Sequence, residues 1–363
     1  MPDKQPKKVA ILLPNLGGGG AERVALASAG DLANRGHRVD LVLVEATGAL
    51  LPLVPKGVRV VDLEAHRLLA ALPPLVRYLR EAKPDALHAH MWPLTVIAIM
   101  AHRLARSGAR LIVTDHVAFS RQYLSAWQMR LLRWTTRLFY PLADRRTVVS
   151  KAAADALARL SGIARAAFDV MYNPISPPSR IASNAEVEKL WKGKGPRLIT
   201  VGSMKAQKNH ALLLTAFARL AAKDAQLMIL GEGHLRPALE EQAKALGIAD
   251  RLALPGFAVD PWPYFASADI FVLSSDYEGF PLVLAEAMHA GLRVVSTDCV
   301  SGPAEILDGG RFGRLVPCGD ADALAAALDA ALAEPADPKR MRDRAAAITG
   351  RAVIDRYAEL LTV

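Results

Sequence analysis

Two glutamates, Glu278 and Glu286, lie eight residues apart in the segment EGFPLVLAE. The glycine and proline after Glu278 predict a turn, and the run PLVLAEAM predicts a helix that begins at Pro281. With a helical rise of about 1.5 Å per residue, the two carboxyls are expected about 10 Å apart, too far to share a proton. N–H groups of the turn lie between them and can donate to a phosphate. This order of groups suits an extended ligand with sugar, phosphate and sugar in line, as in a nucleotide sugar.

Two other turns of the second half have the same design, in which a strand leads through glycine into a helix. The segment VGSMKAQKNH places Lys205 and Lys208 near a helix start, where a lysine is unfavourable unless an anion is bound. The segment LGEGHLRPALE contains Gly231, Glu232 and Gly233. Two solvated lysines are the alternative interpretation, but three such turns in one domain together favour an anionic ligand.

The first half carries two further signals at strand ends. Its first strand leads into LPNLGGGGAERV, whose glycines are Gly17, Gly18, Gly19 and Gly20. They would let a ligand approach backbone N–H groups at the positive end of a helix, although the spacing does not match the GxGxxG dinucleotide fingerprint. Phosphate or acceptor binding and a flexible turn therefore both stay open. His116 follows a later strand, which would direct it toward the ligand edge of a sheet, and a structural histidine is the alternative.

Strand-like and helix-like segments alternate through both halves, which is typical of an α/β protein whose parallel sheets are covered on both faces. The expected strands are 9–14, 38–44, 85–90, 110–116, 145–150, 197–202, 225–231, 251–256, 268–275 and 292–297. The expected parts are an N-terminal Rossmann-like domain (1–175), a proline-rich linker (176–196), a C-terminal Rossmann-like domain (197–345) and a C-terminal helix (346–363). That last helix could cross back to the first domain. Ligands of such sheets bind beyond the carboxyl ends of the strands.

The composition indicates a globular protein of two domains, with 363 residues, 52% of them apolar and 22% charged. The two cysteines, Cys299 and Cys318, belong to no CxxC motif or Cys/His cluster, which argues against a zinc site and fits a reducing compartment. The early apolar run VAILL is too short for a signal peptide, and no apolar window is long enough to span a membrane. A cytoplasmic protein is therefore expected.

Positive charge is concentrated in the first half. Residues 1–175 hold 24 Lys and Arg against 13 Asp and Glu, a net charge of +11, whereas residues 176–363 hold 21 against 23, a net charge of −2. Residues 121–146 combine six arginines and one acid with the aromatic residues Tyr123, Trp127, Trp134, Phe139 and Tyr140. That combination predicts peripheral contact with an anionic membrane on its cytoplasmic face, and solvated arginines on a helix that covers the sheet are the alternative. No nucleic-acid-binding motif accompanies the charge, so no nucleic-acid partner is expected.

The segment SSDYEGFPLVLAEAMHAGLRVVSTDCVSGPAEIL resembles the signature of the family 4 retaining glycosyltransferases. Further similar segments follow the family order: GGGGAERV, HAHMWPL, VVSKAAADAL, VMYNPI, VGSMKAQKN, LGEGHLRPALEEQAKALGIADRLALPGF and FGRLVPCGD. The resemblance covers nearly the whole chain, and E-x7-E is specific in this context although it would carry no information alone. It implies an α/β GT-B fold, in which two Rossmann-like doubly wound domains face each other across a cleft.

The resemblance also implies roles for individual residues. Glu278 would hold hydroxyls of the transferred sugar, and Glu286 would hold the ribose of the nucleotide. Lys208 would contact the diphosphate, and His116 would lie beside the sugar near the point of transfer. The implied donor-binding residues are Ser203, Lys205, Gly231, Glu232, Gly233, Gly256, Phe257, Gly279, Phe280, Pro281, Leu282 and Glu286. The implied acceptor-facing residues are Gly17, Gly18, Gly19 and Gly20.

The reaction implied by the resemblance moves a hexosyl or N-acetylhexosaminyl group from a nucleotide sugar, with UDP favoured, to a saccharide or a lipid-linked acceptor such as a polyprenyl diphosphate. Retention of configuration would follow from front-face displacement, in which the leaving phosphate takes the proton of the acceptor. N–H groups, helix ends and a lysine can stabilise that phosphate, and the first half has no DxD at a strand end, so no metal or other cofactor is expected. Asp320-Ala321-Asp322 is instead predicted to start a helix.

Ser203 departs from the family pattern, because many members have an arginine directly after the glycine of this strand end. Either Lys205 takes over the role of that arginine, or stabilisation of the diphosphate depends more heavily on Lys208. A non-catalytic sugar-binding GT-B scaffold is therefore one alternative function, and a GT-B phosphorylase or nucleotide-sugar epimerase is another.

Overall fold

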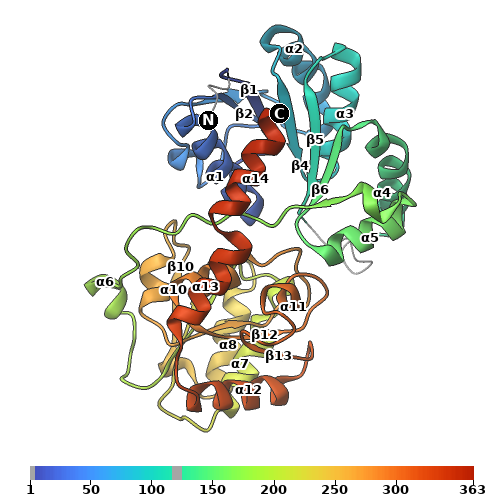
Figure 1. The fold of residues 1–363 in the computed structure, drawn as a ribbon. Coiled ribbons are helices and arrows are strands. Elements are labelled where there is room, and N and C mark those ends of the chain that lie inside the picture. The colour runs from blue at the N-terminus through green and yellow to red at the C-terminus, as the bar shows by residue number, and fades with distance from the viewer. Residues whose placement is uncertain (1–4, 117–124) are drawn as a thin grey trace. The chain divides into compact units, whose positions relative to one another are not determined.

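The computed structural model describes residues 5–116 and 125–363 and divides the chain into two units. Unit 1 consists of Met1–Pro174 and Arg351–Val363, and unit 2 of Ile175–Gly350. Both are α/β units with parallel sheets, so the expected fold class is confirmed (Figure 1). Residues 176–196, which the sequence predicts as a linker, contain helix α6 (Ala185–Glu188) and belong to unit 2.

In the described part of unit 1, seven parallel strands form one sheet in the order β3-β2-β1-β4-β5-β6-β7. The strands are β1 (Lys8–Leu13), β2 (Arg38–Leu43), β3 (Val58–Asp62), β4 (Ala86–His90), β5 (Arg110–Asp115), β6 (Arg145–Val148) and β7 (Asp169–Val170). The helices are α1 (Gly20–Asn34), α2 (Leu72–Ala82), α3 (Leu94–Ala105), α4 (Ala126–Phe139), α5 (Lys151–Ser161) and α14 (Arg351–Thr362).

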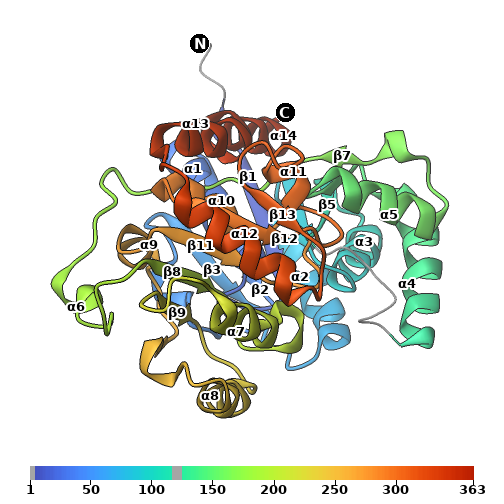
Figure 2. The ribbon, with the colours of Figure 1, turned by 90° about the horizontal axis from the view of Figure 1, so that it is seen from below.

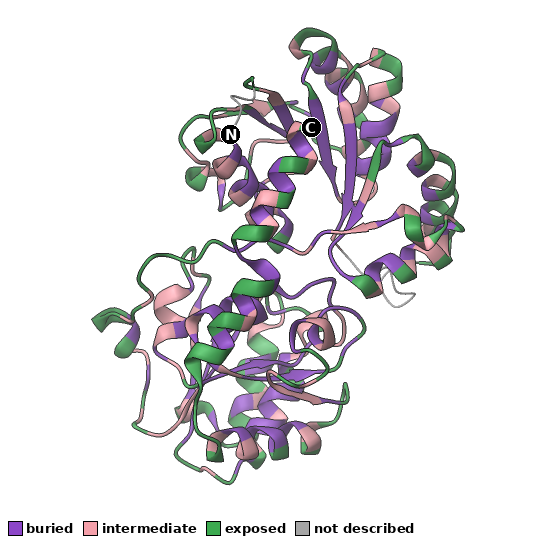
Figure 3. Ribbon diagram, in the orientation of Figure 1, coloured by how far each residue is buried: buried purple, intermediate pink, exposed green. Residues whose placement is uncertain are grey.

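The central strands of unit 1 are buried along nearly their whole length, because helices cover both faces of the sheet (Figure 3). The last helix of the chain, α14, packs against α1 and adds Ala358 and Leu361 to this core. Strand β3 lies at the edge and is largely exposed, and β7 has only two residues. Neither strand is among those expected from the sequence, because neither has a long buried apolar run.

In unit 2, six parallel strands form a second sheet in the order β10-β9-β8-β11-β12-β13. The strands are β8 (Arg197–Val201), β9 (Gln226–Leu230), β10 (Leu252–Gly256), β11 (Ile270–Leu273), β12 (Arg293–Thr297) and β13 (Arg314–Val316). The helices that follow α6 are α7 (His210–Arg219), α8 (Arg236–Ala245), α9 (Trp262–Ala266), α10 (Leu282–Ala290), α11 (Pro303–Ile306), α12 (Ala321–Ala333) and α13 (Pro338–Thr349).

Helices cover both faces of the unit 2 sheet. Helices α7 and α12 pack together on one face, and α10 packs against α13 on the other (Figure 2). Asp320 caps α12 by accepting a hydrogen bond from the N–H of Ala323, which confirms the helix start predicted for Asp320-Ala321-Asp322.

In each sheet, the chain changes the direction in which it adds strands at one point. This point lies between β1 and β4 in unit 1 and between β8 and β11 in unit 2. Ile270 of β11 lies opposite Leu198 of β8, so the loops that follow these two strands leave the same edge of the sheet side by side. Such a point in a doubly wound sheet is the usual place for a ligand.

Candidate active site

The two loops at the switch point of unit 2 bring Lys208 and Glu278 together. The Nζ of Lys208 donates to Oε1 of Glu278 at 2.6 Å, although the two residues are 70 positions apart. Ser275 donates from its hydroxyl to the same Oε1 at 2.7 Å. Glu278 is only 6% exposed, and a buried carboxylate requires such partners because water no longer solvates it.

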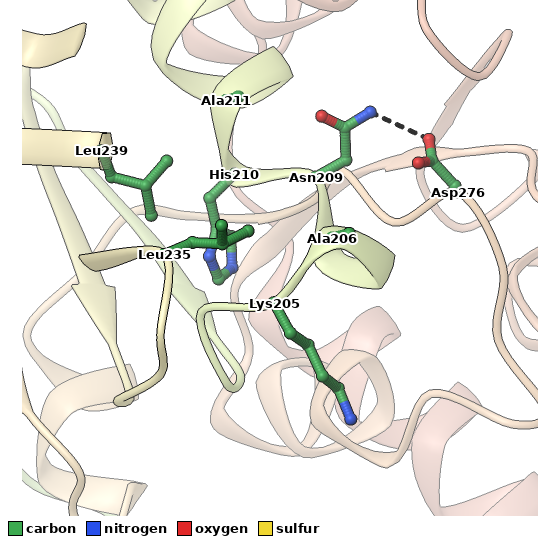
Figure 4. Close-up of a pocket in the computed structure, with 8 residues that line it drawn as sticks. All are labelled: Lys205, Ala206, Asn209, His210, Ala211, Leu235, Leu239 and Asp276. Atoms are coloured by element: carbon green, nitrogen blue, oxygen red, sulfur yellow. Dashed lines mark hydrogen bonds between the residues drawn. The ribbon is translucent and has the colours of Figure 1, made fainter. Parts of the chain in front are cut away.

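Hydrogen bonds hold the loop after β8 against the loop after β11. Gln207 accepts from the N–H of Asp276 through its backbone carbonyl at 3.0 Å and donates from its side chain to the carbonyl of Tyr277 at 3.0 Å. Asn209 donates from Nδ2 to Oδ1 of Asp276 at 2.9 Å, as the dashed line in Figure 4 shows. The position of Lys208, which lies between Gln207 and Asn209, is therefore fixed from both sides.

Asn209 has a left-handed backbone conformation, with φ of 44°, and its side chain also caps α7 by accepting from the N–H of Leu212. An asparagine tolerates this conformation better than most residues. A pocket of about 330 Å³ lies around this turn, lined by Lys205, Ala206, Asn209, His210, Ala211, Leu235, Leu239 and Asp276. In Figure 4 the Lys205 side chain extends away from the Asn209–Asp276 pair.

Helix α10 begins at Leu282, one residue after the predicted start, and Pro281 is its N-cap. Pro281 offers no side chain to cap the helix, so an anion can be stabilised by the N–H groups of the first turn. Glu286 lies in the second turn of α10 and is 7% exposed. Gly279, Phe280 and Pro281 connect Glu278 to this helix and are all buried.

The remaining turns of this edge depend on glycine. Gly231 has a φ of +152°, and a Cβ there would lie 2.1 Å from the carbonyl oxygen of Gly202. Gly302 has a φ of +100°, and a Cβ there would lie 2.5 Å from Cδ of Pro281. The hydroxyl of its neighbour Ser301 donates to the carbonyl of Gly279 at 2.8 Å, which supports the turn before α10 from outside the E-x7-E segment.

Four other predicted donor-binding residues lie at the same edge but on its surface. Ser203, Lys205 and Phe257 are exposed, and the exposed carboxylate of Glu232 pairs with Arg236 one helical turn further on. Gly233 and Gly256 follow β9 and end β10, respectively. All of these positions follow or end strands of the unit 2 sheet.

In unit 1 the predicted glycines lie between β1 and α1. Gly19 is the N-cap of α1 and Gly20 its first residue, with no side-chain cap on the helix. Gly18 has a φ of +113°, which only glycine adopts without strain. Gly17 is exposed. The loop thus has the helix geometry of an anion site at the switch point of its sheet.

His116 follows β5 at this same edge of unit 1. Its Nε2 lies 2.7 Å from Nδ1 of His90, the last residue of β4. Burial lowers the pKa of His116 to about 4, so its ring is neutral at pH 7. The preceding residue, Asp115, accepts from the hydroxyl of Tyr140 at 2.6 Å and from the N–H of Trp92 at 3.2 Å.

Helix α4 presents apolar side chains to solvent. Trp127, Trp134 and Leu138 are 64%, 69% and 66% exposed, respectively. Tyr140 was expected on the same exposed surface. For this residue the expectation is wrong, because Tyr140 is 1% exposed and its hydroxyl donates to Asp115. Phe139 packs partly against the core of unit 1. Arg121 and Tyr123 of the predicted segment lie outside the described residues.

Several residues of these sites carry no strong sequence signal. Ser275 stands three positions before Glu278 in the same turn, and only this spacing points to it. Gln207, Asn209 and Ser301 act through contacts with distant loops.

In the described part of the chain, no group of three or more His, Cys, Asp or Glu side chains is arranged to hold a metal ion. No helix of that part is long and apolar enough to cross a bilayer.

Two family models match successive parts of the chain. The model of Glycosyltransferase Family 4 matches residues 18–177, and that of glycosyl transferases group 1 matches residues 183–347. Together they cover most of both α/β units. The chain therefore belongs to the family 4 glycosyltransferases, and its fold is GT-B.

A Campylobacter jejuni relative, N-acetylgalactosamine-N,N'-diacetylbacillosaminyl-diphospho-undecaprenol 4-alpha-N-acetylgalactosaminyltransferase, is 29% identical over 327 residues, which are 85% of this chain and 86% of the relative. An amylovoran biosynthesis glycosyltransferase of Erwinia amylovora is 26% identical over 302 residues, which are 83% of each chain. Among solved structures, Anabaena HepE in complex with UDP and glucose matches with a TM-score of 0.82 at 20% identity, over 98% of this chain and 99% of that one. These relatives establish a glycosyltransferase, and the structural likeness shows its fold.

Proposed function

We propose that this glycosyltransferase moves a hexosyl or N-acetylhexosaminyl group from a UDP sugar to a saccharide or lipid-linked acceptor in bacterial cell-surface glycan biosynthesis. Transfer retains the anomeric configuration and needs no metal ion. The name of the Campylobacter relative, which contains both N-acetylgalactosamine and diphospho-undecaprenol, supports this donor and acceptor class. The UDP and glucose in the Anabaena structure support a UDP sugar.

The observation that carries the proposal is the ion pair between Lys208 and the buried Glu278 at the switch point between β8 and β11. The pair places a carboxylate, which can accept from sugar hydroxyls, directly before the turn that begins α10. In this proposal the ammonium group of Lys208 stabilises the negative charge that develops on the leaving diphosphate. A lysine and helix N–H groups held in place before the reaction stabilise that charge without reorganisation.

Each nominated residue then has one role. Glu278 binds hydroxyls of the transferred sugar, and Glu286 binds the ribose. Lys208 and the turn at 279–281 bind the diphosphate. His116 lies beside the sugar, and the glycines at 17–20 face the acceptor. The leaving phosphate takes the proton of the acceptor hydroxyl, so no protein nucleophile is required.

The roles of the two glutamates are tested by separating transfer from nucleotide binding. We expect Glu278→Gln to lower kcat by about 100-fold or more, because the amide accepts more weakly from sugar hydroxyls, while the Kd for UDP stays within about threefold. Glu286→Ala is expected to raise the Kd for UDP. Calorimetry with UDP and a UDP-release assay over a panel of nucleotide sugars provide both readouts.

The matched control is Glu240→Gln, which changes an exposed glutamate that pairs with Arg236. It is expected to change neither quantity. The reverse pattern, with UDP binding lost in Glu278→Gln and transfer lost alone in Glu286→Ala, would overturn the assignment. Metal independence is tested in the same assay, since loss of transfer in EDTA and its return with a divalent cation would show that part of the proposal to be wrong.

We also propose that α4 contacts an anionic membrane surface. Trp127, Trp134 and Leu138 form an exposed apolar stripe, with Leu131 between them 43% exposed. Arg130, Arg133 and Arg137 are exposed on the same helix. An amphipathic helix of this kind binds by inserting its apolar side chains while its cations meet lipid phosphates. A lipid-linked acceptor would be reached at such a surface.

Sedimentation with vesicles tests this contact. The full chain is expected to bind vesicles that contain phosphatidylglycerol, and to bind less at high salt because the charges are screened. Trp127→Gln combined with Trp134→Gln is expected to reduce binding about tenfold or more. Leu69→Gln is the matched control, since Leu69 is 80% exposed in the same unit but lies outside α4. Equal binding of all three proteins would remove α4 as the contact surface.

A further inference from the structure

The ring of His116 is in direct contact with the ring of His90. His90 is the last residue of β4 and is 1% exposed. Its Nδ1 lies 2.7 Å from Nε2 of His116, and the two rings meet edge to edge, with centroids 5.0 Å apart and planes inclined by 28°. The proposed reaction uses His116 beside the sugar, and His90 is not one of its site residues.

The register of two neighbouring strands produces this contact. His90 of β4 lies opposite Thr114 of β5, and side chains alternate along each strand. His116, two positions beyond Thr114, therefore extends on the same side of the sheet as His90. Asp115 is bonded to Tyr140 and Trp92, so it is not the group that orients His116.

The rest of the cluster restricts the ring of His90 further. His88 lies two positions before it, and the two ring centroids are 4.0 Å apart. Nε2 of His88 is hydrogen-bonded to the hydroxyl of Thr114 at 2.6 Å. Packing on one side and the hydrogen bond to His116 on the other leave His90 one orientation.

A hydrogen bond between two neutral imidazoles contains one hydrogen, so the tautomers of the two rings are coupled. Burial lowers the pKa of His116 to about 4 and that of His90 well below its ordinary value, which keeps both rings neutral at pH 7. If Nε2 of His116 donates, its Nδ1 is an acceptor. If Nδ1 of His90 donates, Nδ1 of His116 carries a hydrogen and can donate to a ligand.

The burial of the two rings favours the second arrangement. Nε2 of His90 and Nδ1 of His116 are both buried and have no hydrogen-bond partner within the described residues. One of these two atoms must carry a hydrogen. Both atoms are buried, but His116 stands at the sheet edge and is partly exposed, so a bound ligand can accept a hydrogen bond from an N–H there, whereas an N–H on the 1% exposed His90 would stay without a partner.

The geometry points to His90 as a positioning residue, which donates from Nδ1 to Nε2 of His116 and thereby makes Nδ1–H of His116 a hydrogen-bond donor to a hydroxyl of the transferred sugar. This inference rests on the proposed place of His116 beside the sugar. His90 itself does not touch the substrate. Its effect is to hold the second ring in one orientation and one tautomer.

The tautomer is measured on the full chain without substrate by long-range ¹H–¹⁵N correlation of the imidazoles at pH 7, with His116→Gln used to assign the signals. The expected result is hydrogen on Nδ1 of His116. His90→Phe keeps a ring against His88 but has no nitrogen, so His116 is expected to revert to the Nε2–H form. A His116 tautomer that is the same in both proteins, or Nε2–H in the unmodified chain, would overturn the inference.

Kinetics supply the second readout. His90→Phe is expected to lower kcat about tenfold with little change in the KM of the donor, since a single hydrogen bond to the sugar is lost or misdirected. His90→Asn places an amide donor near the position of Nδ1 and is expected to recover kcat to within about threefold of the unmodified chain. Failure of His90→Asn to exceed His90→Phe would show that ring packing, not the hydrogen bond, is what matters.

The control is His102→Gln, which changes a histidine of α3 that bonds the carbonyl of Ala109, and it is expected to leave kcat unchanged. The proposed function and this inference fail in different ways. If His116 has no role at the sugar, His116→Gln and His90→Phe both retain full kcat while the tautomer still changes. If His90 does not position His116, His116→Gln lowers kcat but His90→Phe changes neither kcat nor the tautomer.

Should His90→Phe not fold, the tautomer of His116 in the His90→Asn variant and the kcat of that variant decide the question.

Discussion

Two buried carboxylates, one in each unit, accept hydrogen bonds from specific donors. In unit 2, Lys208 and Ser275 both donate to Glu278. In unit 1, Asp40 is 4% exposed and accepts from Nε of Arg59 at 2.8 Å and from the hydroxyl of Tyr78 at 2.7 Å. The physical cause is the same in both places, since a carboxylate removed from water is tolerated only when donors replace the water.

The pairing of Asp40 predicts a dependence of stability on pH. Burial alone would raise its pKa, but the hydrogen bonds from Arg59 and Tyr78 lower the pKa below its ordinary value of 3.8. Because the folded pKa lies below the unfolded one, the contribution of this group is complete above the unfolded pKa and is lost as the pH falls through the folded pKa. Asp40→Asn is therefore expected to flatten the fall in unfolding free energy below about pH 4, as measured by urea denaturation.

The control for this measurement is Asp62→Asn, which changes an exposed aspartate of the same sheet. It is expected to keep the acid dependence of the unmodified chain. Identical curves for Asp40→Asn and the unmodified chain would contradict the assignment.

Among the elements, strand-to-helix turns set the shape of the edge of the unit 2 sheet at which we propose that the donor binds. Each of these turns brings the backbone of one loop close to that of another, as where Gly231 meets Gly202. The N–H of Gly231 also donates to the carbonyl of Gly256 at the end of β10, so this neighbouring strand is joined to the same loop. These loops are thus supported by backbone contacts as well as by side chains.

Replacing Gly231 tests the importance of this close approach. Gly231→Ala is expected to destabilise unit 2 by about 2 to 3 kcal/mol, because the new Cβ meets a carbonyl oxygen and the φ of an L residue is strained there. The unfolding free energy in urea and the Kd for UDP are both measured, and the Kd is expected to rise. Gly108→Ala is the control, since a Cβ at Gly108 meets nothing within 4 Å. Equal stability of the two variants would show that the loop adjusts without cost.

On the scale of the whole molecule, the chain passes from unit 1 to unit 2 and then returns for its last helix. Helix α14 belongs to unit 1, where Tyr357 is 1% exposed and Leu361 lies in the core. Ion pairs of Arg35 with Asp355 and of Arg351 with Asp31 connect the same helix to α1. The C-terminal residues thus complete a core whose other members lie more than two hundred positions earlier.

Shortening a buried side chain of α14 is therefore expected to destabilise unit 1. Leu361→Ala should cost about 3 kcal/mol, because it removes buried apolar atoms and leaves a cavity. Hydrogen exchange read by mass spectrometry is expected to show faster exchange in the strands of unit 1 than in those of unit 2. Glu359→Ala, on the exposed side of the same helix, serves as control. Faster exchange confined to unit 2 would contradict this division of the chain.

Much of the fold is predictable from the sequence, because buried parallel strands are nearly continuous apolar runs. All ten strands expected from such runs are present, with ends that differ by at most two residues. The strands that were not predicted, β3, β7 and β13, are short or exposed and lie away from the centre of each sheet. Tyr140 was misplaced because an aromatic residue at the end of a basic helix gives no sign of which way its ring turns.

The sequence by itself determined the alternation of strands and helices through the centre of each sheet and the glycine turns at the carboxyl ends of the strands, because these depend on local periodicity and backbone freedom. The tertiary structure alone decided that Glu278 meets Lys208 across 70 positions, and that His90 meets His116 across 26. Both contacts follow from which strands are neighbours and in what register. Strand pairing is set by the burial of whole sheet faces, and no local segment encodes it.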